Sequence, residues 1–235
     1  MATKRKICNL PFSCNKQEVL HQESKSCQQV KTLREENLNV DYMILFKRPK
    51  ADNLFQQLEK DMKYYDGDLA QVKVYGKWHP IPRKQVAYGD DGVYYKYSGN
   101  RLPAKPWSNV PALLEIKKAV EDALDKQYLF NFVLINRYKD GSDHMGEHRD
   151  DEKELAHCAP IASVSLGQAR DFIFKHKDNR AKNKSRTDLK PVSILLQPGS
   201  LLVMKPPTNT FWYHSLPIRK NVLLPRINLT FRVIS

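Results

Sequence analysis

The pattern of apolar and polar positions predicts helices near the N-terminus and strands over most of the remaining chain. Residues 1–38 are rich in Lys, Gln, Glu, Ser and Asn with little apolar periodicity, which predicts a disordered tail. After a short apolar run at residues 42–46, apolar side chains recur at helical spacing beyond Pro49, and again from Pro111 to about Lys126. Both segments are therefore expected to be amphipathic helices that pack on a core.

Short apolar runs separated by Gly and Pro predict strands. The expected strands are residues 72–75, 85–88, 94–97, 130–138, 161–166, 171–176, 192–196, 201–204 and 228–234. Gln197-Pro198-Gly199-Ser200, between two apolar runs, predicts a tight hairpin. Two helices beside a series of short strands favour an α+β, mainly β fold, namely a double-stranded β-helix (jelly-roll) core backed by N-terminal helices. Residues 39–235 contain no linker or repeat and are expected to form one domain.

Three residues provide the chemistry of a metal site. Two imidazoles, His148 and His214, and one carboxylate, Asp150, form the ligand set that holds a non-heme Fe(II) ion and leaves positions open for an oxidant. The segment from His144 to His148 also fits the H-x-x-E-H pattern of inverted zinc peptidases. That chemistry needs both imidazoles on one face of a helix, whereas nearby glycines and strand patterns argue against a helix here.

The last predicted strand has one polar and one apolar face, because side chains alternate along a strand. The polar face carries Arg226, Asn228, Thr230 and Arg232. The apolar face carries Ile227, Leu229, Phe231 and Val233. Taken alone, the pattern also fits an edge strand with a solvated face. Beside an iron site, two guanidinium groups that can each grip a carboxylate suggest a small dianion, and 2-oxoglutarate is the candidate.

The charge of the chain indicates a polyanionic partner. The net charge is +13 over 235 residues with a pI near 9.5, which favours nucleic acid over an anionic membrane, although such a charge can also serve solubility alone. Residues 175–190 contain seven basic and two acidic side chains, which fits contact with a phosphate backbone as well as a solvated face.

The N-terminal segment predicts little about function. Cys8, Cys14 and Cys27 lie there with His21, in a spacing that is loose for zinc and unlike a disulfide-rich secreted domain. No signal peptide and no membrane-spanning apolar run is recognisable, so a soluble intracellular protein is expected. Lys4-Arg5-Lys6 is compatible with import into the nucleus.

Several motifs within residues 40–235 share a pattern with one enzyme family. These motifs are residues 136–141 (NRYKDG), 146–152 (GEHRDDE), 161–167 (IASVSLG), 208–215 (TNTFWYHS) and the spacing Arg226-x5-Arg232. Together they resemble the AlkB family of Fe(II)/2-oxoglutarate dioxygenases. Residues 75–79 (YGKWH), 82–85 (PRKQ) and 105–107 (KPW) resemble the members that repair alkylated bases in duplex DNA.

The resemblance implies a role for each of the residues that match it. His148, Asp150 and His214 would bind iron, and the 2-oxoglutarate contacts would be Asn136, Tyr138, Arg226, Thr230 and Arg232. The substrate-binding residues would be Tyr75, Gly76, Lys77, Tyr95, Lys96, Tyr97, Asp151 and Glu152. Within this set, Tyr97 stacks on the flipped base, Asp151 and Glu152 read its edge, and Tyr75 fills the gap in the base stack. The DNA backbone would be held by Lys175, Lys182, Lys184, Arg186, Arg219 and Lys220. Simpler readings are a surface carboxylate or a partner of Arg149 for Asp151, and an exposed loop aromatic for Tyr75.

The resemblance also implies a reaction. Fe(II), 2-oxoglutarate and O2, with ascorbate as reductant, would hydroxylate the N-methyl group of 1-methyladenine or 3-methylcytosine in double-stranded DNA and release formaldehyde. The alternatives are a demethylase that acts mainly on single-stranded DNA or RNA, and a catalytically silent module that binds damaged DNA. A monomer in the nucleus is expected. Docking on a replication clamp is in doubt, because Lys6-Ile7-Cys8 lacks the aromatic residue of the usual motif.

Overall fold

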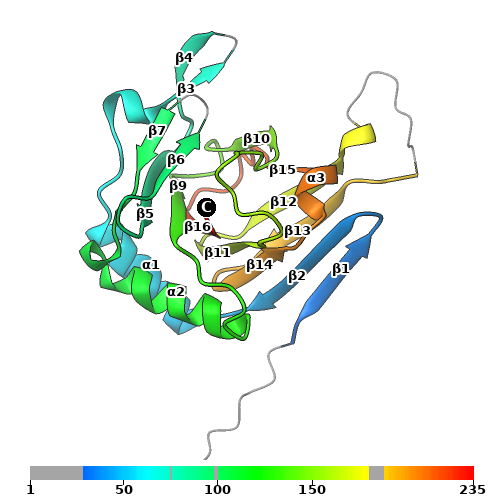
Figure 1. The fold of residues 1–235 in the computed structure, drawn as a ribbon, viewed down its shortest axis with the longest axis horizontal. Coiled ribbons are helices and arrows are strands. Elements are labelled where there is room, and N and C mark those ends of the chain that lie inside the picture. Colours follow the sequence, from blue (N-terminus) through cyan, green and yellow to red (C-terminus); the bar gives the residue numbers. More distant parts are fainter. Residues whose placement is uncertain (1–28, 75, 98–99, 180–187) are drawn as a thin grey trace, which may run out of the picture.

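The computed structural model describes residues 29–74, 76–97, 100–179 and 188–235, and only the backbone of residues 74, 95–97 and 100. Two β-sheets form the body of the molecule, and two helices cover one of them (Figure 1). The larger sheet has the strand order β1-β2-β14-β11-β16-β9-β5-β8, and the smaller has the order β10-β15-β12-β13. β3 pairs with β4 and β6 with β7 in two separate hairpins. The predicted jelly-roll core with N-terminal helices is confirmed.

The helices and strands have the following bounds. The helices are α1 (Arg48–Asp61), α2 (Pro111–Ala123) and α3 (Thr208–Phe211). The strands of the larger sheet are β1 (Lys31–Glu35), β2 (Leu38–Ile44), β5 (Lys84–Gly89), β8 (Lys105–Pro106), β9 (Phe132–Tyr138), β11 (Ile161–Gly167), β14 (Ser200–Met204) and β16 (Arg226–Arg232). Those of the smaller sheet are β10 (Met145–His148), β12 (Arg170–His176), β13 (Val192–Leu196) and β15 (Trp212–Leu216). The hairpin strands are β3 (Gln71–Val74), β4 (Lys77–Pro80), β6 (Tyr94–Tyr97) and β7 (Asn100–Pro103). Short 3-10 turns lie at Gly67–Ala70, Trp107–Asn109 and Lys177–Asn179.

The main core lies between the larger sheet and the two long helices. Each long helix has a proline in its first turn, where the missing N–H costs no helical hydrogen bond. Apolar residues at helical spacing, such as Leu54 and Leu58 of α1 and Ile116 of α2, are fully buried against β9, β11, β14 and β16. A second core fills the space between the two sheets. The face of the larger sheet that turns away from the helices is therefore left to line the interior of the jelly roll.

Two predictions about local structure are wrong. The segment 197–200 does not join a hairpin, because β13 pairs with β12 in the smaller sheet whereas β14 pairs with β11 and β2 in the larger one. The turn, in which Gly199 has a φ of +79°, instead carries the chain from one sheet to the other. The predicted disordered tail, residues 1–38, extends too far, because β1 and the first residue of β2 lie within it. Residues 1–28 lie outside the described part of the chain.

None of the helices in the described ranges has the length and apolar character needed to cross a membrane. The β3–β4 hairpin projects from the body of the molecule (Figure 1). Gly76 in its turn has a φ of +81°, a conformation that glycine adopts without a steric penalty.

Candidate active site

Two neighbouring strands of the smaller sheet bring the predicted metal ligands together. β10 and β15 are antiparallel, and His148 lies directly opposite His214 in their register. Asp150 follows β10, and its Oδ1 lies 3.6 Å from Nε2 of His148 and 3.8 Å from Nε2 of His214. One ligand atom from each of the three residues lies within 4.8 Å of the others. This separation fits three ligands arranged around one metal ion.

The alternative zinc peptidase motif does not have the geometry that it needs. His148 is the last residue of a strand, Met145–His148, and His144 directly precedes that strand. The two imidazoles therefore do not lie on one face of a helix. Nδ1 of His144 instead lies 3.1 Å from the carbonyl oxygen of Ser142.

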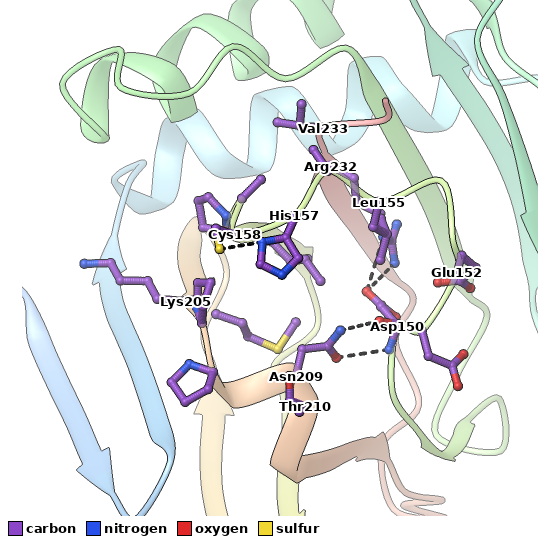
Figure 2. Close-up of a pocket in the computed structure, with 18 residues that line it drawn as sticks. Asp150, Glu152, Leu155, His157, Cys158, Lys205, Asn209, Thr210, Arg232 and Val233 are labelled. Atoms are coloured by element: carbon purple, nitrogen blue, oxygen red, sulfur yellow. Dashed lines mark hydrogen bonds and ion pairs between the residues drawn. The ribbon is translucent and has the colours of Figure 1, made fainter.

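The two carboxylate oxygens of Asp150 have different partners. Oδ2 accepts hydrogen bonds from Nη2 and Nε of Arg232 at 2.8 and 3.2 Å, which leaves Oδ1 toward the imidazoles. The backbone of Asp150 is held as well, because its N–H donates to Oδ1 of Asn209 at 3.0 Å and its carbonyl accepts from Nδ2 of Asn209 (Figure 2). Asn209 belongs to the motif of residues 208–215, but no role for it was predicted. Its contact with Asp150 depends on the turn of α3, which the sequence pattern does not reveal.

The charges at the site suit metal binding. Burial, the largest influence, raises the pKa of Asp150, but Arg232 and the two imidazoles together lower it to about 2. Burial lowers the pKa of His214 to about 3, and His148 lowers it further. At neutral pH the carboxylate is thus ionised and the His214 imidazole is neutral. These are the protonation states in which both groups bind metals.

Beside the three ligands lies a narrow cavity between the two sheets. It has a volume of about 40 Å³, and side chains of both sheets line it. Among the lining residues are the predicted 2-oxoglutarate contacts Asn136, Tyr138, Arg226, Thr230 and Arg232.

The predicted two-faced strand is confirmed as β16. Ile227, Leu229 and Phe231 pack into the core beneath the helices, while the polar side chains face the cavity. The alternative of a solvated edge strand is wrong, because β16 pairs with β11 on one side and β9 on the other, and all seven of its residues are buried.

Arg226 is a buried cation without an anionic partner among the described residues. Nη2 donates to Oγ of Ser165 at 2.9 Å, and the guanidinium lies 5.3 Å from the centre of the Tyr138 ring. Nε has no hydrogen-bond partner. Burial lowers the pKa of Arg226 to about 10, so the group remains charged at neutral pH. Because an unpaired buried charge is costly, this end of the cavity is suited to an anion.

A larger hollow of about 450 Å³ lies beside the metal ligands and shares Asp150, Met204 and Arg232 with the narrow cavity (Figure 2). The predicted base-reading residues Asp151 and Glu152 line it. Asp151 is exposed and Glu152 is half-buried. Arg149, the alternative partner of Asp151, donates instead to the carbonyl of Thr210 at 2.6 Å.

The remaining predicted residues are spread over the surface or lie outside the description. Lys77 and Lys220 are exposed, Lys175 lies 3.4 Å from Glu147, and Arg219 forms an ion pair with Asp171 at 2.7 Å. Tyr75, Lys182, Lys184 and Arg186 lie outside the described residues. Tyr95, Lys96 and Tyr97 form β6, of which only the backbone is described.

The chain is similar in sequence to known oxygenases. Residues 40–232 match the family described as the 2OG-Fe(II) oxygenase superfamily. Bovine "DNA oxidative demethylase ALKBH2" is 58% identical over 202 residues, which cover 86% of this chain and 71% of the bovine protein. The human protein of the same name is 56% identical over 202 residues, with coverage of 86% and 76%.

More distant similarities agree with these matches. Mouse "Alpha-ketoglutarate-dependent dioxygenase alkB homolog 3" is 33% identical over 186 residues, covering 79% of this chain and 62% of the mouse protein. Among solved structures, "The structure of OsALKBH1" superposes with a TM-score of 0.56 at 16% identity and covers 87% of this chain and all of that one. At this identity the similarity shows the fold alone.

Proposed function

The chain belongs to the AlkB family within the 2OG-Fe(II) oxygenase superfamily, and on this basis we propose that it is a DNA repair oxidative demethylase. Its substrates are N-methyl lesions, 1-methyladenine and 3-methylcytosine, in double-stranded DNA. The proposal is supported by the identity to proteins named DNA oxidative demethylase and by the strongly basic composition.

The single observation that carries the proposal is the convergence of His148, Asp150 and His214 beside a cavity that contains an unpaired cation. These three residues would hold Fe(II). The bound metal, with O2, 2-oxoglutarate and ascorbate as reductant, supplies oxidation of the N-methyl group, after which formaldehyde leaves the base. Arg232 fixes the orientation of Asp150 through its Oδ2, and Asn209 fixes the backbone of the same residue.

The polar face of β16 would hold 2-oxoglutarate. Arg226 provides a buried guanidinium for one carboxylate of the dianion. Ser165 and Tyr138 contact this guanidinium, and Tyr138 also lines the cavity. Asn136 and Thr230 contribute neutral polar groups to the same wall. A buried guanidinium selects an anion over a neutral ligand.

The substrate base would be held outside the narrow cavity. Bases such as 1-methyladenine carry a positive charge, so carboxylates at Asp151 and Glu152, directly after the metal ligand, suit recognition of the base edge. The projecting β3–β4 hairpin, with Gly76 in its turn, would bring Tyr75 to the gap that a flipped base leaves in a duplex. Tyr97 of β6 would stack on the base.

Formaldehyde release from a duplex oligonucleotide with one 1-methyladenine tests the proposal directly. We expect release that requires both Fe(II) and 2-oxoglutarate, is at least as fast on the duplex as on the matched single strand, and disappears in a His214→Ala variant. Release from the single strand alone would overturn the duplex assignment. A metal-loaded protein without release from either substrate would be a binding module.

The setting of this activity is part of the same proposal. The protein acts as a monomer in the nucleus, where alkylated duplex DNA is found. No role is assigned to the replication clamp, because the N-terminal motif lacks its aromatic residue.

A further inference from the structure

Arg170, the first residue of β12, is a fully buried arginine for which no role was predicted. It is 1% exposed and does not line the narrow cavity. Its guanidinium donates to three backbone carbonyls: Nη1 to Asp140 at 3.0 Å, and Nη2 to Asp143 at 3.0 Å and to Pro217 at 2.8 Å. No carboxylate among the described residues forms an ion pair with it. One buried cation therefore joins two separate loops.

The two loops that Arg170 joins flank the strands of the metal site. Residues 139–144 lead into β10, which ends at His148, and residues 217–222 follow β15, which contains His214. The loops also contact each other, because Gly141 N–H donates to the carbonyl of Val222 at 2.7 Å and the Gly141 carbonyl accepts from Arg219 N–H at 2.8 Å. Arg170 thus fastens this junction from inside the molecule.

Arg170 also lies near Arg226, the buried cation that lines the narrow cavity, because both approach the ring of Tyr138. Its guanidinium carbon lies 5.9 Å from the centre of the Tyr138 ring, and that of Arg226 lies 5.3 Å from the same centre. Tyr138 lines the cavity, and both arginines contact its ring. The ring therefore connects Arg170, which lies outside the cavity, to the cavity wall. Movement of Arg170 would release Tyr138 and, with it, one side of the space around Arg226.

We propose that Arg170 is a positioning residue that keeps Tyr138 and Arg226 in place for the carboxylate of 2-oxoglutarate farthest from the metal. The inference rests on the proposed function and deepens it. Arg232, which bonds to the metal ligand Asp150, marks the metal end of the cavity, and Arg226, at the other end of β16, marks the distal end. Among the contacts of Arg170, the one with Tyr138 lies at the distal end, and none is with a metal ligand. Loss of Arg170 should therefore weaken binding of a dicarboxylate far more than binding of a monocarboxylate.

The test compares two keto acids that differ only at the distal end. 2-Oxoglutarate and 2-oxobutyrate would be titrated by calorimetry into the full chain loaded with Mn(II), without O2. We expect Arg170→Met to weaken 2-oxoglutarate binding about tenfold and to change 2-oxobutyrate binding less than twofold. Arg170→Lys keeps the charge but not the planar fork, so it should bind 2-oxoglutarate with intermediate affinity. If Arg170→Met does not fold, the lysine variant carries the test alone.

Arg137→Met is the matched control. Arg137 is the neighbour of Tyr138 on β9, and it pairs with Glu59 of α1, so its loss also removes a partly buried arginine contact. It should lower thermal stability without changing 2-oxoglutarate affinity more than twofold. Equal loss of both keto acids in an Arg170 variant, no loss of either, or an equal effect in the control would overturn the role of Arg170. Failure of the wild-type protein to bind 2-oxoglutarate would overturn the proposed function and this inference together.

Discussion

Asp150 shows how one side chain is fixed from three directions. Arg232 bonds to one carboxylate oxygen, two imidazoles face the other, and Asn209 bonds to both the backbone N–H and the backbone carbonyl of Asp150. Groups that orient a metal ligand in this way contribute to metal affinity without touching the metal. Asn209 is the clearest example here, because both of its contacts are to the backbone of the metal ligand Asp150.

Replacing Asn209 with alanine should lower metal affinity about tenfold, because the loop that carries Asp150 loses two hydrogen bonds. Calorimetric titration of Mn(II) into the chelator-treated protein would measure the loss. Asn53→Ala, on the exposed face of α1, is the control and should leave the affinity unchanged. An unchanged affinity in the Asn209 variant would show that Arg232 alone suffices.

Metal ligands could be predicted at the level of single residues, whereas their supporting residues could not. His148, Asp150 and His214 form a recognisable set of residue types, and the alternation of β16 placed Arg226 and Arg232 on one face. Asn209 and Arg170 act through contacts with residues that are distant in sequence. No local spacing encodes such contacts, so only the folded structure reveals them.

At the level of elements, strands with strong apolar runs such as β11 and β14 were predicted, whereas β1 and β10 were missed. β10 has the sequence Met-Gly-Glu-His and β1 has Lys-Thr-Leu-Arg-Glu, so neither has the composition of a strand. Their conformation comes from pairing with β15 and β2. The hairpin prediction at residues 197–200 failed for a related reason, because a tight turn does not specify whether its two strands pair with each other.

Gly141 lies where the two loops of the metal site meet. A methyl group there would lie 1.8 Å from the carbonyl oxygen of Arg219, which is backbone and has little freedom to move. Gly141→Ala should therefore separate the loops and lower the affinity for Mn(II) and for 2-oxoglutarate. Gly146→Ala, where nothing lies within 4 Å, is the matched control. Calorimetry on both variants would check this, and equal affinities would contradict the close contact.

Asp41 of β2 anchors the edge hairpin. It accepts hydrogen bonds from Thr32 and Arg34 of β1 and pairs with Lys205. Burial raises the pKa of Asp41, but Lys205 and Arg34 outweigh it and lower the pKa below its ordinary value of 3.8. Because the pKa is lower in the folded state, the stabilisation is present above about pH 4 and is lost as the pH falls below it.

Asp41→Asn should lower the free energy of unfolding by about 1 kcal/mol at pH 7, since the partners are partly exposed. The difference from the wild-type protein should shrink as the pH falls below about 4. Urea unfolding at several pH values would measure it. A difference that does not change with pH would show that the carboxylate charge does not contribute.

At the scale of the whole molecule, the larger sheet separates the main hydrophobic core from the candidate active site. The helices and the main core lie on one face, and the candidate site lies on the other, between the sheets. Lysines on the exposed surface of the helices are thus separated from the site by the sheet. The net charge of +13 predicts a polyanionic partner, but it does not by itself indicate which surface binds it.

Replacing Lys182 and Lys184 with glutamine should reduce the salt dependence of duplex binding by about two units of slope, because each phosphate contact contributes about 0.9. Turnover of a short methylated nucleotide should be nearly unchanged. The control is Lys60→Gln with Lys118→Gln, two exposed lysines of α1 and α2. Binding measured by fluorescence anisotropy at several salt concentrations would decide, and an unchanged slope would exclude this segment from the interface.

The unpaired guanidinium of Arg226 has a consequence for the lifetime of the protein in a cell. Burial of a cation without a counterion lowers the free energy of unfolding, and an anion that binds beside the cation raises it again. By mass action, a ligand at one hundred times its Kd stabilises the native state by about 2.7 kcal/mol. The supply of a central metabolite would then govern how much enzyme survives proteolysis as well as how fast it works. In cells with little 2-oxoglutarate, both the rate of each enzyme molecule and the amount of intact enzyme would fall, and DNA repair would slow for both reasons.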